Sequence, residues 1–159
     1  MYILGIDPGI SRMGWGVVKL DKDNNVVWVD GGCITTKSGV ENSIRYWEIF
    51  TELEKIILKY KIKLIGLEKV FFAKNVKNAI ITGEARGVVL MIGGKYDIPI
   101  IEYTPNEMKM MVTGYGNSSK EQIQAVVKLV LNLDFIPQPD DHADALAIAY
   151  ITARGYNRD

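Results

Sequence analysis

The sequence predicts a mixed α/β fold, in which a five-stranded sheet is covered by helices on both faces. Its first third consists of short apolar runs separated by turn residues, a pattern typical of an antiparallel meander. Beyond residue 40, segments with helical spacing alternate with short apolar runs, as in parallel strands joined by helices. The 159 residues, 48% hydrophobic and 24% charged, suit one globular domain spanning residues 1–159.

Five apolar runs bounded by turn or polar residues are the expected strands. They cover residues 2–6, 15–20, 26–33, 62–67 and 98–103. The polar segment 21–25 is the turn between the second and third strands. The first three runs form the meander, and the last two add parallel strands.

Helical spacing and capping signals predict the helices. The first should cover residues 41–60, with a buried face made of Ile44, Trp47, Phe50, Leu53, Ile57 and Leu58. A second covers residues 75–92 and is expected to stop at Gly93-Gly94. Capping boxes at 104–107 and 118–121 open a short helix and a helix running to about residue 131. An alanine-rich helix from about 140 to 153 comes last.

Composition and charge exclude several classes of protein. Cys33 is the only cysteine, which excludes a disulfide framework and fits a reducing cytoplasm. The uncharged apolar stretches are far shorter than the roughly 20 residues of a membrane helix. Residues 1–7 have no basic segment before their apolar run, so no signal peptide is expected. The net charge is zero, but residues 59–128 carry +5, which permits either a basic face or a scattered solvated surface.

Carboxylates stand at the ends of apolar elements. Asp7 and Glu68 follow two predicted strands, and Asp141 and Asp144 lie three residues apart on one face of the last helix, with Asp140 just before them. Each acid also has an ordinary structural interpretation as a turn former, a solvated strand end or a first-turn helix acid. Asp144 lies within an apolar segment, where an ionised carboxylate is costly unless paired or bound to metal.

The donor set favours a hard cation. Oxygen ligands without cysteine select Mg²⁺ or Mn²⁺ over zinc. The only histidine, His142, is expected at the surface beside Asp141. Lys120 opens a helix whose free N–H groups suit a phosphate, although a solvated lysine is the alternative. One of Phe71 and Phe72 should be exposed near the acids and could stack on an unpaired base, unless both pack inside.

These motifs together resemble the RuvC family of Holliday-junction endonucleases, which has the ribonuclease H-like fold. The residues that carry the resemblance are Gly5-Ile6-Asp7-Pro8-Gly9, Gly14-Trp15-Gly16, Glu68-Lys69-Val70-Phe71, Ala73-Lys74-Asn75, Gly83-Glu84-Ala85-Arg86-Gly87, Lys109, Gly114, Gly116, Lys120 and 141–147. The resemblance implies metal-binding acids at Asp7, Glu68, Asp141 and Asp144. It also implies DNA contacts by Phe71, Lys74, Lys109 and Lys120.

The same resemblance implies a function and partners. It implies a cytoplasmic homodimer that binds four-way junction DNA and nicks two strands symmetrically with Mg²⁺, in recombination and repair. A branch-migration complex of the RuvA and RuvB type is the expected protein partner. For the dimer contact, the helix 75–92 has small residues four apart at Ala79, Gly83 and Gly87, which would allow close approach of a second copy. Packing of this stripe against the protein's own sheet is the alternative.

Three other classes share some of these features. Actin-like ATPases and sugar kinases open with a similar first motif, but they need a second lobe that 159 residues cannot supply. A ribonuclease H-like protein of RNA processing, such as the YqgF group, also pairs an early with a late aspartate. The third is a binding module that recognises branched DNA without cutting it, against which the four intact acids argue.

Overall fold

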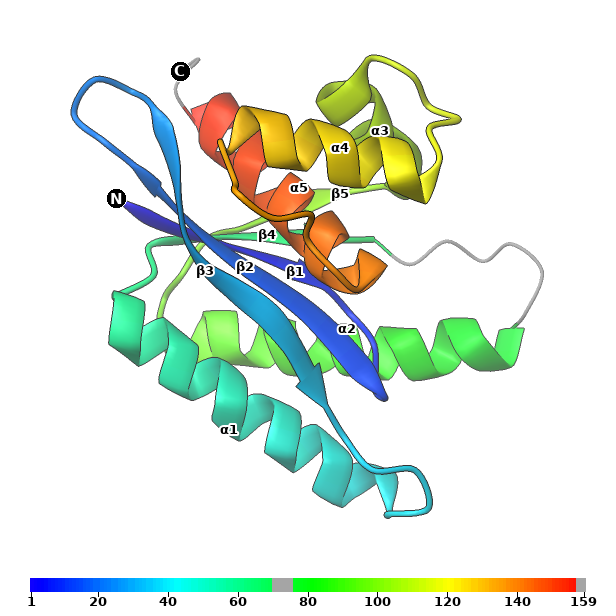
Figure 1. Cartoon of the computed structure of the whole chain (residues 1–159). Helices are drawn as coiled ribbons and strands as arrows, with labels where there is room; N and C mark the ends of the chain where they lie inside the picture. Colours follow the sequence, from blue (N-terminus) through cyan, green and yellow to red (C-terminus); the bar gives the residue numbers. More distant parts are fainter. Residues whose placement is uncertain (70–75, 157–159) are drawn as a thin grey trace.

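The chain folds into a central five-stranded sheet between two layers of helices (Figure 1). The computed structural model describes residues 1–69 and 76–156. The strands are β1 (Tyr2–Asp7), β2 (Arg12–Leu20), β3 (Val26–Thr35), β4 (Leu64–Glu68) and β5 (Ile100–Tyr103). The helices are α1 (Asn42–Tyr60), α2 (Val76–Lys95), α3 (Pro105–Thr113), α4 (Lys120–Val130) and α5 (Asp140–Tyr156).

The sheet has the order β3-β2-β1-β4-β5. Strands β1, β2 and β3 pair antiparallel, whereas β4 and β5 extend the sheet in parallel from β1. This confirms the predicted meander followed by parallel strands. The parallel pairs bring the carboxyl ends of β1 and β4 side by side, at the edge where the acids lie.

Each face of the sheet has its own core, because successive residues of a strand point to opposite sides. On one face Leu4 and Ile6 pack with buried residues of α1 and α2. On the other, Ile3 packs with buried residues of α3, α4 and α5. Helices α1 and α2 therefore cover one face, and α3, α4 and α5 cover the other (Figure 1). Among the described helices, none has both the length and the apolar character needed to cross a bilayer.

Three details of the helices differ from the sequence prediction. In α1, Ile44, Trp47 and Leu58 are exposed, and Ile49 joins the buried face instead. The α2 helix continues through Gly93-Gly94 to Lys95. Gly93 is needed for packing, since a Cβ there would lie 2.6 Å from Cδ1 of Ile100 on β5.

The capping boxes are correct in kind, and one is displaced by a residue. Thr104 and Glu107 form the predicted reciprocal cap of α3. The N-cap of α4 is Ser119, with Gln122 as its partner, instead of Ser118 with Glu121. Ser118 is buried and donates to the carbonyl oxygen of Tyr115 at 2.7 Å, so its hydroxyl serves the preceding loop.

The small-residue stripe of α2 is divided between the inside and the outside of the molecule. Ala79 is buried against the protein. A Cβ added at Gly83 or Gly87 would meet nothing within 4 Å, so both glycines face open space. The alternative in which the whole stripe packs on the sheet is therefore correct for Ala79 alone.

Candidate active site

Asp7 and Glu68 end two neighbouring parallel strands and point to the same face of the sheet. The register pairs Ile6 of β1 with Leu67 of β4, so the next residues are the two acids. Two positions earlier, Gly5 and Gly66 both lie beneath α5, and the alternation of the strands puts Asp7 and Glu68 on that side as well. Both acids are half-buried.

Glycines on the sheet let α5 approach closely. A Cβ at Gly5 would lie 2.1 Å from the carbonyl oxygen of Ala145, and one at Gly14 would lie 1.9 Å from that of Asp141. No ordinary side chain fits at such distances, so the helix rests directly on the strands. This contact places the first turns of α5 over the end of β1, and with them Asp141 and Asp144.

The carboxyl groups perturb one another's ionisation. Burial, followed by repulsion from Glu68 and Asp144, raises the pKa of Asp7 well above its ordinary value. Burial and the Asp144 charge raise the pKa of Glu68 to about 7, although a hydrogen bond with Asp7 opposes the shift. Burial and the charges of Asp140 and Asp141 raise the pKa of Asp144 to about 6. The four predicted acids therefore form one electrostatic cluster.

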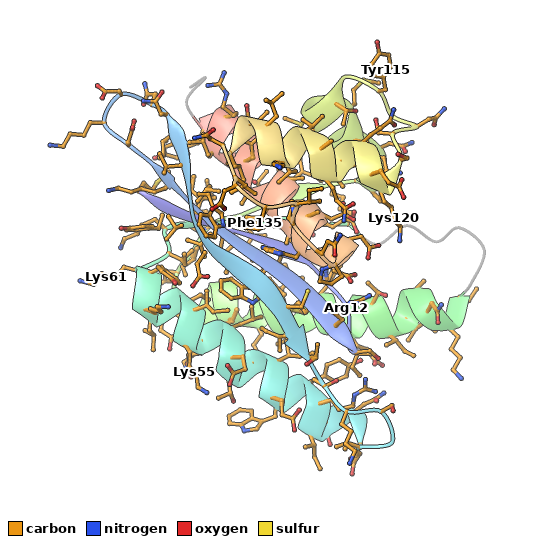
Figure 2. All side chains as sticks on the ribbon, in the orientation of Figure 1. Arg12, Lys55, Lys61, Tyr115, Lys120 and Phe135 are labelled. Atoms are coloured by element: carbon orange, nitrogen blue, oxygen red, sulfur yellow. The ribbon has the colours of Figure 1, made fainter. Side chains whose placement is uncertain are left out.

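Three basic side chains face this cluster. Nε of Arg12 forms an ion pair with Oδ2 of Asp141, and Nζ of Lys120 pairs with Oδ2 of Asp140. Both basic residues lie beside the first turn of α5 (Figure 2). The charge of Lys109, on α3, lowers the pKa of both Glu68 and Asp144 and so partly offsets the effect of burial. The predicted basic residues Lys109 and Lys120 thus lie at the acids, and Arg12 is an addition.

The cluster has the right chemistry for a hard cation. Its donors are carboxylate oxygens, and Oδ2 of Asp141 is buried without a hydrogen-bond partner among the described residues. In residues 1–69 and 76–156, no three His, Cys, Asp or Glu side chains converge closely enough to hold a metal ion together. The pairing of Asp141 with Arg12 directs one of the four carboxylates to a cation of the protein itself.

A buried arginine fixes the turn after Asp7, and the sequence did not indicate it. Nη2 of Arg45 donates to Oγ of Ser11 at 2.9 Å, and Nε donates to Oγ1 of Thr36 at 2.8 Å. Thr36 in turn donates to the carbonyl oxygen of Ile10 at 2.6 Å. The one sequence signal was a charged residue between the apolar positions of α1. These bonds tie the turn between β1 and β2 to α1, which holds the end of β1 in place.

Of the remaining residues singled out in the sequence, His142 is buried, and the three between Glu68 and α2 lie outside the described part of the chain. His142 is buried, stacks on Phe135 and has Nδ1 3.4 Å from the carbonyl oxygen of Gln138, so its predicted surface position is wrong. The desolvation of His142 lowers its pKa. Phe71 and Lys74, the two DNA contacts predicted after Glu68, lie outside the described residues, as does Phe72.

A mixed sheet of this order, with acids at the ends of two neighbouring strands and more acids on a helix that lies over them, has the ribonuclease H-like fold. A sequence model described as "Crossover junction endodeoxyribonuclease RuvC" matches residues 3–152. The chain belongs to this RuvC family.

Relatives and solved structures agree with that assignment. The chain is 44% identical over 149 residues to the RuvC of Caldanaerobacter subterraneus, which covers 94% of this chain and 90% of that protein. It is 46% identical over 149 residues to the RuvC of Ruminiclostridium cellulolyticum, covering 94% of this chain and 89% of that protein. The structure of Thermus thermophilus RuvC in complex with a Holliday junction substrate matches with a TM-score of 0.86 and 28% identity, over 99% of this chain and 96% of that one.

Proposed function

We propose that this protein resolves four-way DNA junctions by hydrolysing phosphodiester bonds at the acid cluster of Asp7, Glu68, Asp141 and Asp144. The observation that carries the proposal is the meeting of acids from β1, β4 and α5 at one edge of the sheet, in a member of the crossover junction endodeoxyribonuclease family. The Thermus thermophilus relative, solved with its Holliday junction substrate, supports the choice of DNA. Recombination and DNA repair are the processes that produce and consume such junctions.

The four acids would hold Mg²⁺, two ions per site, with Mn²⁺ as a substitute. Carboxylates whose pKa values are raised by burial and mutual repulsion gain from a divalent cation that neutralises them. Bound Mg²⁺ would supply activation of the attacking water and stabilisation of the departing oxygen. The raised pKa values are opposed by a hydrogen bond with Asp7 and the Lys109 charge at Glu68, and by the charges of Lys120 and Lys109 at Asp144.

The basic residues would position the DNA backbone. Lys120 begins α4, where free N–H groups and the positive end of the helix favour a phosphate, and its side chain is 72% exposed. Lys109 lies on α3, close enough to affect Glu68 and Asp144 through its charge. The cations therefore surround the acids, so that a phosphate attracted to them would lie at the cutting site. Phe71 and Lys74 remain proposed DNA contacts on the strength of the family resemblance.

A homodimer would provide the second cutting site. On the outer side of α2, Val76, Ile80, Leu90 and Met91 are exposed, and the open glycines Gly83 and Gly87 lie on the same side at helical spacing. An apolar stripe with small residues at its centre allows two helices to approach closely, and an isologous contact would bury it in both copies. Two acid clusters related by a two-fold axis could then cut two symmetric strands.

Three further expectations accompany this function. We propose that residues 1–159 act as one nuclease domain and that the protein works in the cytoplasm, where bacterial chromosomal DNA lies. A branch-migration complex of the RuvA and RuvB type is the proposed protein partner.

The decisive assay is cleavage of a synthetic four-way junction beside a linear duplex and an RNA–DNA hybrid, with and without Mg²⁺. We expect paired, Mg²⁺-dependent nicks in the junction, and their loss in Asp144→Asn with binding unchanged within a few-fold. If the protein cuts the RNA–DNA hybrid faster than the junction, a function in RNA processing is favoured. Tight junction binding without cutting under any metal would indicate a binding module and refute the proposed hydrolysis.

A further inference from the structure

Arg12 lies where β2 and α5 meet, directly beside the acid cluster. It is the first residue of β2, two positions before Gly14, which contacts the main chain of Asp141. Residues two apart in a strand share a face, so the Arg12 side chain projects toward the first turn of α5. There its Nε atom pairs with Oδ2 of Asp141.

This ion pair is suited to exchange. The Arg12 side chain is 48% exposed, so water reaches its guanidinium, whereas Oδ2 of Asp141 is buried. The contact lacks hydrogen-bond geometry, since Oδ2 of Asp141 has no hydrogen-bond partner in the described part of the chain. The guanidinium therefore neutralises Asp141 without being fixed to it.

The surroundings of Arg12 give it two possible anionic partners. Asp141 belongs to the acid cluster, where its charge contributes to the raised pKa values of Asp7, Glu68 and Asp144. The second partner is the DNA backbone, which the proposed function brings to the same edge of the sheet. A guanidinium matches the geometry of a phosphate as well as that of a carboxylate, because its N–H groups form a planar fork.

We propose that Arg12 is an exchangeable counterion of the acid cluster. It pairs with Asp141 until that carboxylate ligates a divalent cation, and it then binds a phosphate of the DNA. This inference rests on the proposed function, because it requires Asp141 to be a cation ligand. Arg12 thereby keeps Asp141 neutralised before the site is loaded and adds a phosphate contact afterwards.

The proposal predicts effects of opposite sign on two equilibria. In Arg12→Gln, Asp141 has no competing cation, so Mn²⁺ should bind roughly five- to thirtyfold more tightly, the effect of removing one unit charge about 4–8 Å from a dication in a water-like dielectric. The same variant should bind a junction with non-hydrolysable linkages about three- to tenfold more weakly in Mn²⁺, since it lacks a phosphate contact. In EDTA, where Arg12 pairs with Asp141 and makes no phosphate contact, the loss of junction affinity should be smaller than in Mn²⁺.

Titration calorimetry with Mn²⁺ and fluorescence anisotropy with the junction measure these effects without relying on cleavage. Arg12→Lys restores the charge and should return Mn²⁺ affinity toward that of the parent chain. Arg154→Gln is the matched control, because it removes an exposed arginine from the other end of α5 and should change neither equilibrium.

The outcomes separate this inference from the proposed function. If the parent chain binds no Mn²⁺, the proposed metal site itself fails. If the parent binds Mn²⁺ and Arg12→Gln binds it equally or more weakly, Arg12 is not a counterion and serves only to join β2 to α5. If Mn²⁺ binding tightens but junction affinity in Mn²⁺ is unchanged, the exchange to phosphate is refuted.

Discussion

Replacing Gly14 with alanine tests whether the close contact between β2 and α5 positions the acids. A Cβ at Gly14 would lie 1.9 Å from the carbonyl oxygen of Asp141, whereas Cβ contacts below 3.0 Å are essentially never observed. The first turn of α5 must therefore move away by roughly 1.1 Å. The atoms in the way belong to the backbone, so no side-chain rotation relieves the contact.

Two magnitudes follow from this displacement. Overpacking of this kind costs about 1–3 kcal/mol. For a chain of this length each kcal/mol corresponds to about 2–4 °C, so the melting temperature should fall by roughly 2–12 °C. A displacement of about 1 Å in a catalytic constellation costs about 100-fold in rate, and Asp141 and Asp144 would both shift relative to Asp7.

Thermal denaturation and single-turnover cleavage of a four-way junction measure the two effects separately. The matched control is Gly155→Ala, also in α5, where a Cβ meets nothing within 4 Å. It should be neutral or slightly stabilising, because alanine favours the helix. If Gly14→Ala melts like the parent chain and cleaves at the parental rate, the spacing of α5 above the sheet does not position the acids.

Three further predictions concern charge and assembly. In EDTA, Asp144→Asn should gain stability relative to the parent as pH rises from 4 to 6. The folded pKa of Asp144, about 6, lies above its ordinary 3.8, so ionising it costs free energy that is absent at low pH; paired melting curves measure the difference. Lys109→Ala and Lys120→Ala should each lower the number of counterions released on junction binding by about one, or slow cleavage. Fluorescence anisotropy at several salt concentrations measures the first effect, and cleavage rates measure the second. Gly87→Glu should give a folded monomer that loses paired incision, as judged by sedimentation and circular dichroism.

Each of these predictions has a contradicting result. Melting curves of Asp144→Asn and the parent that run parallel in pH would remove Asp144 from the coupled cluster. Unchanged salt slopes and rates in both lysine variants would leave the basic residues as a solvated surface. A folded dimer of Gly87→Glu would place the dimer contact elsewhere, and an unfolded chain would contradict the open space beside Gly87.

Local patterns in the sequence were sufficient to predict most of the secondary structure. The apolar run of β1 and the capping box at Thr104 depend on neighbouring residues, and both elements are present in the structure. The placement of Asp7 and Glu68 at strand ends also follows locally, because an apolar run that ends in an acid puts that acid at the edge of a sheet. Their assignment as metal ligands remains a prediction.

What failed depended on packing between different segments. Gly93 is a sound helix terminator by local rules, yet α2 continues through it to Lys95, and Ile100 of β5 packs where a Cβ at Gly93 would stand. His142 is polar and follows two aspartates, and its burial is decided by its packing against Phe135. Each contact joins residues seven positions apart that belong to different segments, so the rules that apply within one helix do not predict it.

The sequence by itself determined the layers of the fold, the acidic residues and the family. Only the tertiary structure decided how the acids are brought together and what neutralises them. The glycines of β1 and β2 let α5 rest on the sheet, and Arg12 meets Asp141 across that contact. The physical reason is the distance along the sequence over which each interaction acts. Backbone preferences and the alternation of side chains act over a few residues, whereas the packing of α5 on β1 and β2 and the pairing of Arg12 with Asp141 join residues more than a hundred positions apart.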